Sequence, residues 1–137
     1  MFKLLRKGKN WKLFSRISNQ NLLSKFYSIA DRFLITSSWE NYPTVCVESQ
    51  CTGTGIFGFD TCGTKESEEF DGTNKTLELK NSNFVQYGDL DALERVVRRM
   101  LTTNYNREDL AQRARERFSK EKMAEKYIAL YKEILDL

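Results

Sequence analysis

The sequence predicts an α/β fold in which a parallel sheet of about four strands is flanked by helices. Short apolar segments at 33–36, 55–59 and 84–87 have the character of buried strands. Segments with helical periodicity alternate with them, and this order implies crossover connections and a parallel sheet. At 137 residues with 40% hydrophobic residues, the chain suits one domain that buries roughly two thirds of its unfolded surface.

The amino-terminal third contains the first two predicted strands. Residues 11–17 mix apolar and polar side chains and predict a short strand. Asn19 can then cap a helix that ends at Asp31. Five positions of this helix share an apolar face: Leu22, Leu23, Phe26, Tyr27 and Ala30. A buried strand at 33–36 follows, and residues 37–42 form the loop at its carboxyl end.

The next helix begins at the only proline of the chain. Pro43 suits the first helical position, because proline has no N–H that would be left unpaired there. Three backbone N–H groups then remain to face a ligand, those of Thr44, Val45 and Cys46. Gly53 is expected to end this helix. The helix therefore offers its amino-terminal donors at the carboxyl edge of the sheet.

The second half of the chain alternates in the same way before it becomes helical. After the strand at 55–59, residues 60–66 form a loop on the ligand side, and 67–82 are expected to be an acidic exposed excursion with a short strand at 76–79. The strand at 84–87 precedes three helices, at 90–101, at 106–118 and from Ser119 onward. The last helix repeats apolar residues at helical spacing: Met123, Tyr127, Leu130, Tyr131 and Ile134.

Composition argues against several classes of function. The net charge of +3 is small, and basic residues alternate with acidic ones, so we expect no nucleic-acid partner. The chain has no histidine, which excludes Ser–His and Cys–His nucleophiles and histidine metal sites, and we expect no metal. The three cysteines are an odd number and are expected to be structural thiols.

The sequence does not show the features of a signal peptide or of a membrane helix. Residues 1–10 carry four basic side chains but no apolar run of the length a signal peptide requires, and no segment approaches the ~20 apolar residues of a membrane helix. We therefore expect a cytoplasmic protein. Its basic start gives at most a peripheral contact with the inner membrane surface.

Two carboxylates bracket the start of the helix at Pro43. Glu40 and Glu48 are separated by seven residues, one before the helix and one on its second turn. Free N–H groups at a helix start hold phosphate groups, and carboxylates accept hydrogen bonds from hydroxyls. A nucleotide diphosphate with hydroxyl-rich ends would fit such an arrangement.

This spacing, followed by the sequence Ser-Gln-Cys-Thr-Gly-Thr-Gly-Ile-Phe-Gly-Phe-Asp at 49–60, resembles the signature of the retaining, nucleotide-sugar-dependent glycosyltransferases of family 4. The resemblance spans roughly residues 19–87. Asn41, Tyr42 and Pro43 fit the family pattern, whereas Gly55 stands where proline is commoner and Cys62 where a second glycine is usual. The resemblance implies a GT-B enzyme whose second, Rossmann-like domain binds the donor. The chain, 1–137, would then be one such carboxyl-terminal domain, truncated at its amino-terminal side.

The resemblance also implies roles for individual residues. Glu48 would accept hydrogen bonds from the ribose hydroxyls, and Glu40, at the catalytic position, would hold the donor sugar near its reacting face. Tyr42 and Thr44 would bring backbone N–H groups to phosphate, with Asn41 and Pro43 shaping the loop. Gly63 and Thr64 would belong to a glycine-rich turn near the ligand. The nucleotide-sugar is a substrate, no cofactor is expected, and acceptors in polysaccharide or lipid-linked glycan assembly follow by analogy.

Other features leave the activity of the isolated chain open. Family members carry an Arg and a Lys on an earlier strand and turn to neutralise the leaving diphosphate, and the 39 residues before Glu40 are too few to hold that region or an acceptor domain. A separate amino-terminal GT-B half is one expected partner. The alternative is a non-catalytic interaction module whose exposed sheet edge pairs with another chain or with itself. A third alternative is a flavodoxin-like domain that binds a phosphate ligand at the same helix start.

Overall fold

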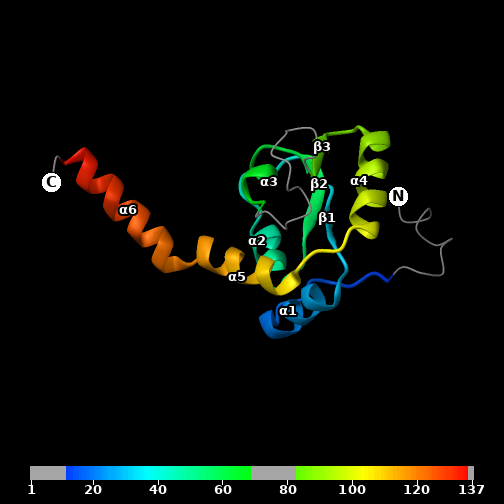
Figure 1. The fold of residues 1–137 in the computed structure, drawn as a ribbon, viewed down its shortest axis with the longest axis horizontal. Coiled ribbons are helices and arrows are strands. Elements are labelled where there is room, and N and C mark those ends of the chain that lie inside the picture. The colour runs from blue at the N-terminus through cyan, green and yellow to red at the C-terminus, as the bar shows by residue number, and fades with distance from the viewer. Residues whose placement is uncertain (1–11, 69–82, 136–137) are drawn as a thin grey trace.

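A computed structural model describes residues 12–68 and 83–135, and it has the predicted α/β architecture (Figure 1). Three strands, β1 (Phe33–Ile35), β2 (Ile56–Asp60) and β3 (Phe84–Gln86), form a parallel sheet in the order β1-β2-β3. Phe33 pairs with Ile56 on one side of β2, and Phe84 pairs with Gly58 on the other. The described residues thus contain three strands where about four were predicted.

The strand predicted at 11–17 is wrong for the part that the structure describes. Residues 12–18 have no regular structure, and the side chains of Leu13 and Phe14 are exposed. The Phe14 ring instead lies 4.8 Å from the ring of Phe26, centroid to centroid. A mixed apolar and polar pattern does not make a strand unless a neighbouring backbone completes its hydrogen bonds. The strand predicted at 76–79 lies outside the described residues.

The first two helices have the predicted starts. In α1 (Gln20–Ile29) the Asn19 side chain accepts a 3.0 Å hydrogen bond from the Leu22 N–H. α2 (Thr44–Cys51) begins one residue later than predicted, with Pro43 as its N-cap. Gly53 follows α2 with a φ of +84°, and a Cβ there would lie 2.6 Å from the Arg107 carbonyl oxygen. Glycine is therefore required both by the backbone and by the close approach of a later helix.

The core has two layers, one on each face of the sheet. Neighbouring residues of β2 point to opposite faces, as expected for a strand. Ile56 packs with Ile35, Cys46 of α2 and Phe84 on one face. Phe57 packs with Val96 and Met100 of α4 (Leu90–Thr102) on the other face. The sheet is consequently held between α2 and α4, which Figure 1 shows on its two sides.

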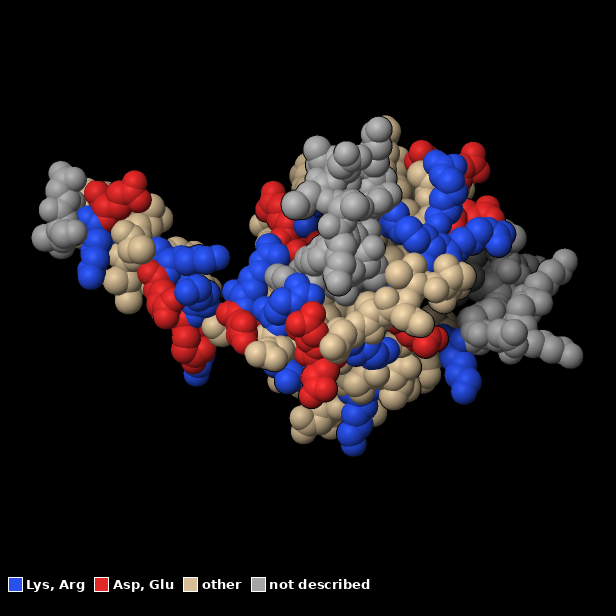
Figure 2. All heavy atoms as spheres, viewed as in Figure 1, with Lys and Arg blue, Asp and Glu red and all other residues tan. Residues whose placement is uncertain are grey.

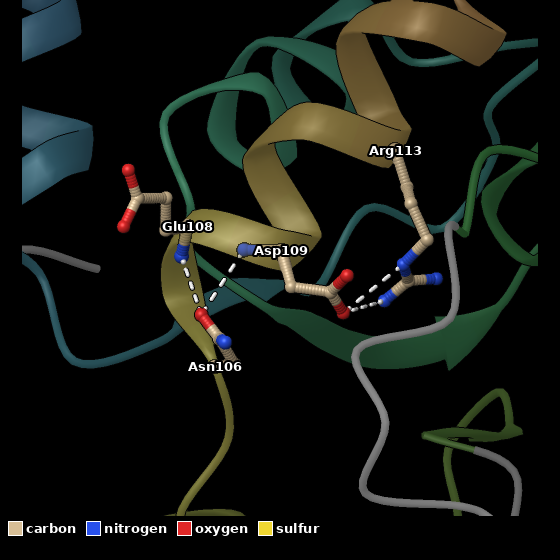
Figure 3. Close-up of polar contacts among 4 residues, drawn as sticks. All are labelled: Asn106, Glu108, Asp109 and Arg113. Carbon is tan, nitrogen blue, oxygen red and sulfur yellow. Dashed lines mark hydrogen bonds and ion pairs between the residues drawn. The ribbon is translucent and has the colours of Figure 1, made fainter.

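The next helix, α5 (Arg107–Arg117), packs on α2. Its cap is the Asn106 side chain, which accepts hydrogen bonds of 3.1 Å from the N–H groups of Glu108 and Asp109 (Figure 3). Asp109 in turn forms an ion pair of 3.1 Å with Arg113, one turn further on. The cap provides an acceptor for two N–H groups that would otherwise lack one, and this stabilises the start of α5.

One arginine at the start of α5 fixes the position of α1. The guanidinium of Arg107 donates to the carbonyl oxygens of Ala30 (2.8 Å) and Ser28 (2.7 Å) and to the hydroxyl of Thr54 (2.7 Å). The Thr54 hydroxyl donates to the Tyr27 carbonyl oxygen at 2.6 Å. These contacts hold the end of α1 against the loop after α2, and thereby place Tyr27 beside α2.

The last helix stands apart from the sheet. α6 (Lys120–Ile134), capped by Ser119, has no buried residue and leads away from the rest of the molecule (Figure 1). α4 packs against β2 and β3, whereas α6 has no comparable contact with a strand. On the face drawn in Figure 2, Lys and Arg side chains are interspersed with Asp and Glu, along α6 as elsewhere. That face shows no broad surface of one charge.

Candidate functional site

A hollow of about 670 Å³ lies beside the amino-terminal half of α2. It is enclosed by the start of α2, the end of the short helix α3 (Gly63–Glu66) and the junction between α5 and α6. Its polar lining comes from seven residues of mixed charge: Tyr42, Thr44, Glu48, Glu66, Arg117, Ser119 and Lys126. Hydrogen-bond acceptors, hydrogen-bond donors and two basic side chains therefore surround one space that is large enough for a small molecule.

Glu48 stands on the exposed side of α2, at the rim of this hollow. The buried residues of α2 are Cys46, Ser49 and Gln50, so Glu48 does not belong to the buried face of the helix. The Glu48 carboxylate also borders a second hollow of about 280 Å³, between α1 and α2, where it accepts a 3.4 Å hydrogen bond from the Tyr27 hydroxyl. An exposed carboxylate with one long hydrogen bond keeps most of its capacity to accept further ones.

Tyr27 is held in its neutral form. Burial, together with the charge of Glu48 and the hydrogen bond to it, raises the pKa of Tyr27 to about 12. The hydroxyl therefore serves as a hydrogen-bond donor toward Glu48 throughout the neutral range.

The start of α2 offers fewer free donors than predicted. Among the described residues, the backbone N–H groups of Thr44 and Val45 have no acceptor. The N–H of Cys46, in contrast, donates to the Pro43 carbonyl oxygen at 3.0 Å, so the prediction for Cys46 is wrong. A tight first turn satisfied this donor within the helix itself. Burial raises the pKa of the Cys46 thiol to about 11, which agrees with a structural cysteine.

Glu40 and Glu48 do not line the same hollow. Glu40 is half-buried, and it is not among the residues that line the larger space. Its carbonyl oxygen accepts a 3.1 Å hydrogen bond from the Gly63 N–H. A Cβ on Gly63 would overlap the Asn41 carbonyl group. The glycine thus makes room for the chain's own loop at 40–42, which sits on the start of α3.

The rest of the glycine-rich turn is also held by internal contacts. Thr64 is fully buried, and its hydroxyl donates to the Phe59 carbonyl oxygen and accepts from the Thr61 N–H, both at 2.9 Å. Cys62 precedes α3 with a φ of +54° and a ψ of −105°, a conformation that side chains with a Cβ rarely adopt. This backbone conformation explains why glycine is usual at this position in the family that the sequence resembles.

The remaining predicted residues are spread around the helix start. Pro43 is buried under the loop, whereas Asn41 and Thr44 are exposed. The ring of Tyr42 is 44% exposed and lines the larger hollow. Burial raises the pKa of Tyr42, with Glu66 acting in the same direction and Arg117 opposing it. The Tyr42 hydroxyl consequently lies where both a cation and an anion act on it.

Sequence reasoning missed Tyr27, Arg117 and Lys126. Arg117 ends α5, and its guanidinium donates to the carbonyl oxygens of Glu68 (2.7 Å) and Glu66 (3.1 Å). It lies far from the motif in sequence, and no local pattern indicates that α5 and α6 would meet beside α2. Tyr27 was expected only as one apolar position of its helix. The packing of α1 and α5 against α2 brings Tyr27 and Arg117 to this region, and the first turns of α6 bring Lys126.

The described ranges, 12–68 and 83–135, contain neither a metal-binding cluster nor a membrane-spanning helix. These residues contain no group of three or more cysteine, aspartate or glutamate side chains placed to bind a metal ion. None of their helices combines the length and the apolar character needed to span a bilayer.

Comparison with known proteins identifies the family. The model of the family described as glycosyl transferases group 1 matches residues 2–117, which is most of the chain. No curated protein and no solved structure gives a significant match. The chain belongs to the group 1 glycosyltransferase family.

Proposed function

We propose that this chain is the donor-binding domain of a retaining, family 4 type glycosyltransferase with the GT-B fold, and that it binds a nucleotide-sugar at the start of α2. The observation that carries the proposal is the hollow beside α2 in a member of a glycosyltransferase family. Glu48 stands at its rim, and two N–H groups without described acceptors lie at the adjoining helix start.

In the proposed pose, two kinds of protein group bind the nucleotide-sugar. The ribose hydroxyls donate to the Glu48 carboxylate, which is exposed and only weakly engaged by Tyr27. The diphosphate meets the backbone N–H group of Tyr42, in the loop before α2, and that of Thr44, at the first position of α2, where the helix dipole favours negative charge. Arg117, which also lines the hollow, adds a positive charge, although its guanidinium also binds two carbonyl oxygens.

The loop at 40–42 then presents the sugar end of the donor. Glycosyl transfer builds positive charge at the anomeric carbon and negative charge on the departing diphosphate, so a carboxylate near the sugar and donors near the phosphate stabilise the transition state. We assign the carboxylate role to Glu40, the catalytic position of the motif. Asn41, Pro43, Gly63 and Thr64 hold the loop and the turn against each other.

The wider assignment follows from the same chemistry. The domain occupies residues 1–137 and requires an acceptor-binding half to complete transfer, whether on the same polypeptide or on another. We place it in polysaccharide or lipid-linked glycan assembly on the cytoplasmic side of the membrane, where the basic residues of 1–10 would favour an anionic surface. The outer edge of β1, which has one neighbouring strand among the described residues and carries an exposed Leu34, is the proposed contact for a further strand.

Isothermal titration of the full chain with UDP, GDP and their sugars tests the proposal. We expect weak but saturable binding of at least one of these ligands, because half of a two-domain site supplies only part of the contacts. Circular dichroism confirms that the protein is folded in the same buffer. A folded protein that shows no heat of binding at millimolar ligand would contradict the proposal.

A further inference from the structure

Trp39 is a tryptophan that the fold leaves in solvent. It is 76% exposed, although tryptophan is highly buried on average in proteins. It lies on the loop that follows β1, at the carboxyl edge of the sheet, which is the edge where open α/β sheets bind their ligands. Because so much of the ring is in solvent, it contributes little to the stability of the described fold.

The backbone beside Trp39 is held by the turn at α3. The carbonyl oxygen of Glu40, the next residue, accepts a 3.1 Å hydrogen bond from the Gly63 N–H. The Asn41 carbonyl group occupies the space that a Cβ on Gly63 would fill. The buried Pro43 then leads into α2. The ring is therefore attached to a well-anchored loop, so that less conformational freedom is lost when a ligand packs on it.

Trp39 adjoins the end of the site to which the donor sugar is assigned. Glu40 holds the sugar in the proposed pose, and the Cα atoms of adjacent residues are about 3.8 Å apart. Glu48 and Tyr42 line the hollow beside α2, whereas neither Glu40 nor Trp39 does. A donor that runs from Glu48 past Tyr42 to Glu40 therefore leaves the hollow at its sugar end, and it reaches the indole ring there.

We propose that the indole ring of Trp39 stacks on the sugar ring of the donor, and that this sugar is a neutral hexopyranose; the inference rests on the proposed donor site. The C–H groups of a pyranose form an apolar face with a weak positive potential, which suits the negative face of an aromatic ring. Glu40 is the one charged residue in the segment 36–43. An anionic sugar such as a uronic acid would bring a second carboxylate close to Glu40, and like charges repel.

Isothermal titration of the full chain with UDP, UDP-glucose, GDP and GDP-mannose tests the proposal. Trp39→Ala should bind the sugar nucleotides about three- to tenfold more weakly, which is the usual effect of losing one aromatic contact. It should bind UDP and GDP as before, because Trp39 does not line the hollow. Trp39→Phe keeps a ring and should retain most of the affinity. Leu101→Ala, at a 65% exposed side chain near the end of α4, is the control and should change nothing.

Fluorescence observes the ring directly. The chain has two tryptophans, and Trp11→Phe leaves Trp39 as the only one. We expect a sugar nucleotide to protect Trp39 from quenching by acrylamide, whereas the matching nucleoside diphosphate gives no protection.

Three results would overturn the stacking while leaving the proposed function intact. In the first, Trp39→Ala binds the sugar nucleotides as tightly as the unchanged chain does. In the second, acrylamide quenches Trp39 equally with and without the sugar. In the third, UDP-glucuronate, the anionic probe, binds as tightly as UDP-glucose. A folded chain that binds none of the nucleotides would instead contradict the proposed function, and the stacking with it.

Discussion

The Tyr27 hydroxyl of α1 donates a hydrogen bond of 3.4 Å to the Glu48 carboxylate of α2. This contact links the end of one helix to the residue on which the proposed donor site depends. It exists because Arg107 and Thr54 hold the end of α1 against the loop that follows α2. Tyr27 is therefore a positioning residue for Glu48.

Tyr27→Phe is expected to change the alkaline stability of the protein. Burial and the neighbouring Glu48 raise the pKa of Tyr27 from 10.0 to about 12. The folded state thus holds this proton more tightly than the unfolded state. The resulting stabilisation is fully present below pH 10 and is lost as the pH rises through about 12. Urea unfolding at a series of pH values should show a shallower alkaline loss in Tyr27→Phe, and an unaltered profile would contradict the assignment.

Gly63→Ala should disturb the loop before α2. An added Cβ would overlap the Asn41 carbonyl group, so residues 40–42 must move, at a cost of about 1–3 kcal/mol. We expect lower stability together with weaker nucleotide binding. Gly88→Ala is the matched control: Gly88 has a φ of +87° but open space around it, so only backbone strain is added and binding is retained. Urea unfolding and titration of both variants measure the two effects.

Cys62→Gly should stabilise the protein. Cys62 has a φ of +54°, and strain of this kind costs on the order of 1–3 kcal/mol for a residue with a Cβ. Glycine relieves the strain but adds entropy to the unfolded chain, so we expect a net gain of about 1 kcal/mol. Cys62→Ala keeps the Cβ and should bring no gain. Equal stability of the two variants in urea would show that the backbone at this position is not strained.

Thr64→Val should be strongly destabilising although the two side chains have similar shapes. It leaves the Phe59 carbonyl and the Thr61 N–H without their buried partner, at a cost of about 2–4 kcal/mol in total. Thr64→Ser keeps the hydroxyl and loses one methyl group, or about 1 kcal/mol. If valine proved as well tolerated as serine in thermal unfolding, the hydroxyl would have no structural role in the turn.

Local signals were the most reliable part of the sequence analysis. Helices were expected to start at Asn19, Asn106 and Ser119, and each of these side chains accepts a hydrogen bond from the first turn of its helix. The strands at 33–36, 55–59 and 84–87 were likewise confirmed. Caps and buried apolar runs are readable because their causes lie within a few residues of each other.

Features that depend on distant contacts could not be predicted. The segment at 12–17 has a composition compatible with a strand, but it pairs with no strand in the part of the chain that the structure describes. Gly63 could be recognised as part of a turn, yet only the folded loop shows that Asn41 occupies the space its missing side chain leaves. Arg117 reaches the candidate site because α5 packs on α2. The motif thus indicated the region around the start of α2, and tertiary packing determined which side chains line the hollow there.

The most direct test of the donor-binding account is the affinity of Glu48→Gln for UDP and GDP, measured by isothermal titration. Hydrogen bonds to a charged carboxylate contribute about 1.5–3 kcal/mol each, so the account predicts a loss of tenfold or more in affinity. Stability should not change, because Glu48 is exposed. Glu108→Gln, at an exposed glutamate in the first turn of α5, is the control and should bind like the unchanged chain. A Glu48→Gln protein that binds nucleotide as tightly as the unchanged chain would contradict the account.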